Sequence, residues 1–284
     1  MINSGEMKEY FFENASVISI FSFFILMVGF FSLTADSFLT QRNILNLLRQ
    51  SAPILIAAIA MTFVITTGGI DLSVGSTLAI VNATCAVLLQ IETNWVLVIF
   101  ILIFIGVVCG LVQGYFIAFE GIPAFIVTLA GMSAIRGIAL LMTEGFTIPI
   151  DKNLGIIFLG RGWLFGIPVP AIIAVIIIIF GYFLLNNTKF GRYITGIGSN
   201  SEAVRRSGVN VKLYTLLTYV FCGISASIGG IIIAARLGSG SSNAGVMFEL
   251  EVIAAVVLGG TNLFGGRGTI IGTLLGAMTI AVIG

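Results

Sequence analysis

The chain has 284 residues, of which 58% are hydrophobic and 9% are charged, and its formal net charge is +1. Soluble globular domains carry about 25% charged residues, so this composition excludes an ordinary soluble protein. The chain contains no histidine, which excludes imidazole metal sites and histidine acid–base catalysis.

Nine apolar runs follow one another along the chain, separated by polar turns and loops. A helix of about 20 residues crosses a hydrocarbon core of roughly 30 Å, and most of the runs are near this length. The 35 glycines fit close helix packing inside a bilayer. The runs cover residues 15–33, 44–67, 76–89, 95–119, 122–142, 167–185, 213–235, 250–258 and 269–283.

These runs predict an all-α fold, a polytopic transmembrane helical bundle of about 9–10 spans with broken or re-entrant helices. Residues 1–284 are expected to form a single transmembrane domain. The last run reaches Gly284 without a polar cap, and a bilayer penalises unsatisfied backbone groups. We therefore expect one further span after this position.

Two glycine-rich interruptions have similar sequences and suggest an internal repeat. Residues 64–72 read VITTGGIDL and residues 256–263 read VVLGGTNL, and each is followed by a second apolar run. Paired glycine breaks at matching places are typical of repeat-built transporters with broken helices. Two ordinary turns that both favour Gly and Asx are the alternative. The candidate pathway residues are Gly68, Gly69, Asp71, Ser73, Gly259, Gly260 and Asn262.

Some charged residues lie within or beside apolar sequence. Asp71 is flanked by apolar sequence on both sides, and its place before a run favours helix capping over substrate contact. Arg136 lies inside a run, and we expect it to bind backbone carbonyls or to snorkel. Glu249 and Glu251 open the short run 250–258, where carboxylates complement the helix dipole.

No motif in the sequence indicates catalysis. A GxxxxGK[ST] phosphate-binding loop is absent, so the chain does not bind ATP through such a loop. Cys85, Cys109 and Cys222 lie inside apolar runs without metal-ligand spacing, which favours buried small hydrophobic residues. We therefore expect neither an enzyme nor a metal site, and no cofactor bound by this chain.

The loop 186–212 concentrates the positive charge of the chain. It holds five basic residues against the single acid Glu202, which predicts a cytoplasmic location under the positive-inside rule. Such a loop can set topology or contact anionic lipid. A helix carrying these charges can instead dock in a groove of another protein. The basic residues are Lys189, Arg192, Arg205, Arg206 and Lys212.

Part of this loop resembles a known signature. Glu202-Ala203-Val204, with Gly208 after three further residues, is similar to the Glu-Ala-Ala-x-x-x-Gly loop of bacterial ABC importer permeases, with Val204 replacing the second Ala. Residues 66–76 (TTGGIDLSVGS), 190–200 (FGRYITGIGSN) and 248–260 (FELEVIAAVVLGG) look like signature stretches of the ribose/galactose/xylose-type sugar permeases. The resemblance spans roughly residues 44–284.

The resemblance implies a multi-pass permease subunit of an ATP-driven monosaccharide importer in the bacterial cytoplasmic (inner) membrane. It implies a second permease copy, a cytoplasmic ABC ATPase that carries ATP and Mg, and a periplasmic or lipid-anchored substrate-binding protein. Membrane lipid surrounds the chain, and no nucleic acid is expected. A nucleoside or branched-chain amino acid ABC permease, or an ion-coupled secondary transporter, are the alternatives. The residues expected to couple to the ATPase are Glu202, Ala203, Val204, Arg205, Arg206 and Gly208.

Overall fold

The computed structural model describes residues 15–283, and their regular structure is almost entirely helical. The longer helices are α2 (Ala15–Thr34), α3 (Gln41–Thr66), α4 (Val74–Gln90), α5 (Trp95–Ala118), α6 (Ala124–Thr143), α8 (Val169–Asn187), α9 (Lys189–Arg206), α10 (Val211–Leu237), α11 (Phe248–Leu258) and α12 (Ile270–Ile283). This confirms the predicted all-α, polytopic helical membrane protein.

The remaining elements are short and connect α6, α8, α10 and α11. A 3-10 turn, η1 (Gly155–Ile157), leads into the four-residue helix α7 (Phe158–Arg161). Two antiparallel strand pairs complete the fold. They are β1 (Ile148–Pro149) with β4 (Ser239–Gly240), and β2 (Trp163–Leu164) with β3 (Ile167–Pro168).

Six helices in the described part of the chain are long and apolar enough to cross a bilayer: α2, α3, α5, α6, α8 and α10. Three further apolar runs form shorter helices, with 17 residues in α4, 11 in α11 and 14 in α12. Each of these three begins or ends at one of the glycine breaks. By length and composition, residues 15–283 therefore contain six spans and three shorter helices.

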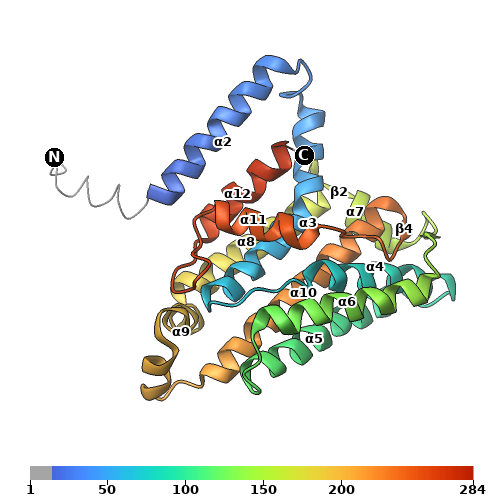
Figure 1. The fold of residues 1–284 in the computed structure, drawn as a ribbon. Helices are drawn as coiled ribbons and strands as arrows, with labels where there is room; N and C mark the ends of the chain where they lie inside the picture. Colours follow the sequence, from blue (N-terminus) through green and yellow to red (C-terminus); the bar gives the residue numbers. More distant parts are fainter. Residues whose placement is uncertain (1–14, 284) are drawn as a thin grey trace.

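α10 runs through the middle of the bundle and packs against α3, α4 and α5, whereas α2 lies on the outside against α12 (Figure 1). Glycines bring α5 and α10 into backbone contact. A Cβ atom on Gly106 or Gly110 of α5 would overlap the backbone of Gly223 or Tyr219 of α10. This is the close helix packing that the glycine content predicts.

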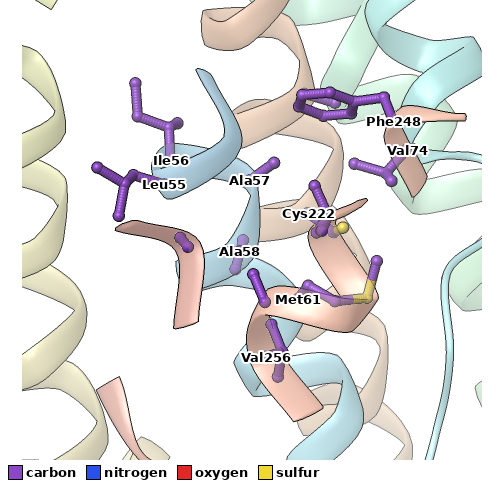
Figure 2. Packing of buried hydrophobic residues seen from close by; sticks show 14 of the residues in the cluster. Leu55, Ile56, Ala57, Ala58, Met61, Val74, Cys222, Phe248 and Val256 are labelled. Carbon is purple, nitrogen blue, oxygen red and sulfur yellow. The ribbon is translucent and has the colours of Figure 1, made fainter. Parts of the chain in front are cut away.

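The main core lies where α3, α10 and α11 meet. Met61 of α3, Cys222 of α10 and Val256 of α11 are fully buried in it (Figure 2). Phe248, at the start of α11, and Val74, at the start of α4, extend the same cluster. The helices that border the glycine breaks are therefore anchored in the centre of the molecule.

Candidate functional site

The predicted loop 186–212 is mostly helical, because α9 fills its centre as two segments that meet at Asn200. Asn200 has non-helical angles (φ −160, ψ 92), and its side-chain oxygen accepts a hydrogen bond from the Ala203 amide at 2.9 Å. This is N-cap geometry, so a second helix starts here. Gly208, with φ +83, closes that helix, and its amide donates to the Arg205 carbonyl at 3.0 Å. We call residues 200–208 the coupling segment.

The charges of the coupling segment are exposed and paired with each other. Glu202 accepts hydrogen bonds from Arg205 Nε at 2.8 Å and from Arg206 Nε at 2.9 Å. These hydrogen bonds, first from Arg205 and then from Arg206, lower the pKa of Glu202 to about 2. Exposed ion pairs contribute little to folding stability, so stability alone does not explain this arrangement.

The apolar residues of the coupling segment differ in their orientation. Ala203 is exposed, whereas Val204 is half-buried. A Cβ atom on Gly196 would approach a Val204 methyl group to 2.9 Å, so Val204 lies over the first segment of α9. Val204 therefore helps to hold the two segments together, and part of its side chain faces inward, away from any partner.

The first segment of α9 contacts both glycine breaks at one point. A Cβ atom on Gly198 would overlap the Thr66 carbonyl of α3 and the Gly266 amide. The Gly266 amide donates to that same Thr66 carbonyl at 3.0 Å. The end of α3, the break between α11 and α12, and α9 therefore meet backbone to backbone beside the coupling segment.

The two breaks share one hydrogen-bond pattern at the ends of α3 and α11. Gly68 (φ +84) donates to the Ile65 carbonyl at 2.9 Å, and Gly260 (φ +87) donates to the Val257 carbonyl at 2.9 Å. The next amide in each break reaches one carbonyl further back, which completes a Schellman motif. When the two glycine breaks are aligned by their Gly-Gly pairs, Gly68 matches Gly259. In the structure Gly68 corresponds to Gly260 instead, because the Schellman motif requires positive φ at this position.

The neighbouring glycines serve packing. A Cβ atom on Gly259 would overlap the backbone of Gly272 in α12. One on Gly69 would overlap the Tyr219 hydroxyl of α10. Asn262 closes the second break, since its Oδ1 accepts from the Phe264 amide at 3.1 Å. Five of the seven candidate pathway residues therefore act at the ends of helices, either by closing a turn or by allowing close packing.

Asp71 and Ser73 form a buried polar group in the first break. Asp71 Oδ1 accepts hydrogen bonds from the Ser73 amide at 2.9 Å and the Ser73 hydroxyl at 2.7 Å. Gln113 of α5 donates to the Ser73 hydroxyl at 2.6 Å. α4 begins at Val74 with Ser73 as its N-cap residue, so Asp71 closes the turn before the cap and does not bind the first helical amides. Asp71 and Ser73 line none of five cavities of about 230–410 Å³ that the described residues form.

Arg136 behaves as the sequence predicts and binds backbone carbonyls. Its Nη1 donates to the carbonyls of Ser242 at 3.0 Å and Ala244 at 3.3 Å, and its Nη2 donates to the Gly245 carbonyl at 3.2 Å. The Arg136 guanidinium thus holds the loop between β4 and α11.

Within residues 15–283, no group of three or more Cys, Asp or Glu side chains is placed to hold a metal ion.

The structure also contains a cavity, lined by both polar and apolar residues, that no sequence motif indicates. It has a volume of about 410 Å³ and lies between α4, the C-terminal end of α10, the loop 239–247 and the start of α11. Arg236 and Glu251 line it together with Asn243. The stretch SGSSNAG at residues 239–245 is rich in small polar residues and is the one sequence signal that points to this region.

Comparisons with known proteins give a consistent result. The chain is 38% identical to the ribose import permease protein RbsC of Haemophilus influenzae, over 97% of this chain and 85% of that protein. It is 43% identical to RbsC of Bacillus subtilis, over 92% and 81%. It is 34% identical to the xylose transport system permease protein XylH of Escherichia coli K12, over 94% and 84%. No solved structure matches the chain.

A family model described as "Branched-chain amino acid transport system / permease component" matches residues 43–284. The match covers most of the chain, including α3 to α12, both glycine breaks and the coupling segment. This chain belongs to that family of permease components.

Proposed function

We propose that this chain is the membrane-spanning subunit of an ATP-driven importer that passes a monosaccharide across the cytoplasmic membrane. The proposal is supported by the family, by the ribose and xylose permeases among its relatives, and by the six helices that can span a bilayer. The chain itself is a permease and not an enzyme.

The coupling segment is the docking site for a separate cytoplasmic ATPase. The basic residues around α9 support a cytoplasmic location for it under the positive-inside rule. Glu202, Arg205 and Arg206 offer fixed, exposed charges of both signs, which can set the register of a partner. ATP and Mg belong to that ATPase.

The observation that carries the proposal is the backbone junction at Gly198. Movement of the coupling segment reaches α3 and the α11–α12 break directly, because no side chain lies between these backbones to absorb it. Packed interfaces switch between discrete arrangements and do not deform continuously. Closure of the ATPases would therefore reorient the helices that adjoin the two breaks.

Two further partners complete the proposed importer. A second copy of the chain encloses the path, and a periplasmic or lipid-anchored binding protein delivers the sugar. α5 and α6 expose many large apolar side chains, which are available to lipid and to the second copy.

Charge reversal in the coupling segment tests the docking site. The variant Glu202→Arg turns a segment of mixed charge into a basic one, and we expect the ATPase to be lost on co-purification. Glu120→Arg is the matched control, because Glu120 is also an exposed acid but lies outside the coupling segment. It follows Phe119, whose carbonyl accepts a hydrogen bond from Lys212. If both variants retain the ATPase equally, docking at this segment is wrong. Uptake that continues without ATP, with ion gradients intact, would instead indicate a secondary transporter.

A further inference from the structure

A cavity with both polar and apolar lining residues occupies the end of the bundle opposite the coupling segment. α9 joins α10 at its N-terminal end, whereas the cavity adjoins Arg236 in the last turn of α10. A second cavity of about 230 Å³ lies between α3, α10, α11 and α12 and shares Arg236 and Glu251 with the first. Small-molecule sites occupy about 300–1,000 Å³, so the 410 Å³ cavity has room for a ligand of monosaccharide size. We call it the Arg236–Glu251 cavity.

The lining of this cavity contains charged atoms without partners. Arg236 Nη1 is buried and has no hydrogen-bond partner within the described residues. The Glu251 carboxylate is exposed at the first turn of α11 and forms no ion pair among those residues. A buried donor without a partner carries a desolvation cost, which a ligand oxygen would relieve.

The wall of the cavity is held in place by hydrogen bonds to residues of α4 and α6. Asn82 of α4 accepts the Ser241 amide at 2.8 Å, and Arg136 of α6 binds the Ser242 and Gly245 carbonyls at 3.0 and 3.2 Å. These contacts fix the loop 239–247 before any ligand arrives. A preorganised wall lowers the entropy cost of binding.

We propose that the Arg236–Glu251 cavity binds the hydroxyl groups of the transported sugar after the binding protein releases it. This inference rests on the proposed function and adds the site where the permease itself contacts its substrate. Arg236 donates to hydroxyl oxygens, and Glu251 accepts from hydroxyl hydrogens. The pair has no net charge, which favours a ligand without net charge, and a zwitterion with its carboxylate on Arg236 and its ammonium on Glu251 is the competing ligand that the test must separate from a sugar.

Cysteine protection tests the site on the purified chain in nanodiscs. Asn243→Cys places a thiol in the lining, and Lys152→Cys is the control, because Lys152 is exposed beside β1 at the same end and lines neither cavity. Both are labelled with an impermeant maleimide, against the wild-type background of Cys85, Cys109 and Cys222. The ligands are a panel of aldopentoses and aldohexoses at saturating concentration, with leucine as the zwitterionic alternative.

We expect at least one sugar to slow the labelling of Asn243→Cys about fivefold or more, with no effect on Lys152→Cys. When Glu251→Gln is added to Asn243→Cys, the sugar concentration that gives half-maximal protection should rise about tenfold, because one charge-assisted hydrogen bond is lost. Glu144→Gln, an exposed acid of the same end that lines neither cavity, should leave it unchanged. Protection by leucine alone, or by no ligand, overturns the sugar site.

A second measurement separates this inference from the proposed function. Proteoliposomes with the ATPase and the binding protein report ATP-driven sugar uptake by the wild-type chain. Uptake without protection of Asn243→Cys means that the cavity is not the site, while the importer stands. Protection without ATP-driven uptake means that the site stands, while the proposed importer fails.

Discussion

The two ends of α10 differ in how their polar groups are satisfied. Near its N-terminal end, Gly198, Thr66 and Gly266 bring three backbones together, and the Gly266 amide donates to the Thr66 carbonyl. At its C-terminal end, Arg236 and Glu251 line a cavity and leave hydrogen-bonding atoms without partners. A region that transmits movement benefits from tight packing, whereas a region that binds a ligand must keep groups unpaired.

The largest effect is expected at the backbone junction. In Gly198→Ala the new Cβ atom would overlap the Thr66 carbonyl and the Gly266 amide, neither of which can move without shifting a helix. Overpacking of this kind costs about 1–3 kcal/mol, and we expect a fall in Tm together with at least a tenfold loss of uptake.

Gly196→Ala is the control for that change. It lies in the same segment of α9, and its Cβ atom would meet only a methyl group of Val204, which can rotate. Alanine also has the higher helix propensity, by about 1 kcal/mol in a helix interior. Uptake should therefore remain near the wild-type rate. Equal losses for both variants would show that the junction has no special role.

A smaller effect is expected at the loop that forms the cavity wall. Arg136→Met keeps an unbranched side chain in place of the arginine stem and removes the three hydrogen bonds to Ser242, Ala244 and Gly245. We expect a loss of about 1–3 kcal/mol, because carbonyls of that loop become unsatisfied. Hydrogen exchange should rise within residues 241–247 and stay unchanged at α9.

Arg42→Met is the control for that loop, since Arg42 is an exposed arginine at the start of α3. It should alter hydrogen exchange in neither region. A rise in exchange that includes α9 to the same degree would contradict the separation of the two ends.

The sequence predicts the fold better than it predicts the site. The nine apolar runs all form helices, and Arg136 binds carbonyls as expected, because hydropathy and the cost of a bare charge in a bilayer are local properties. The number of full spans and the pairing of Gly68 with Gly260 depend on where each helix stops, which backbone angles decide. The Arg236–Glu251 cavity joins residues from α4, α10 and α11, and no single stretch of sequence contains that information.

The smallest effect is the expected absence of a pH response in the coupling segment. The pKa of Glu202 is about 2 instead of 4.5, because Arg205 and Arg206 donate hydrogen bonds to the carboxylate. A lowered carboxyl pKa means that the ion pairs are fully present above about pH 4.5 and are lost as the pH falls towards 2. The affinity of the permease for its ATPase should then change less than about twofold between pH 8 and pH 5, because no histidine is present to titrate there. A titration of complex formation over this range, with uptake measured in parallel, checks this. A steep loss of affinity towards pH 5 would mean that Glu202 gives up its arginine partners when the ATPase binds.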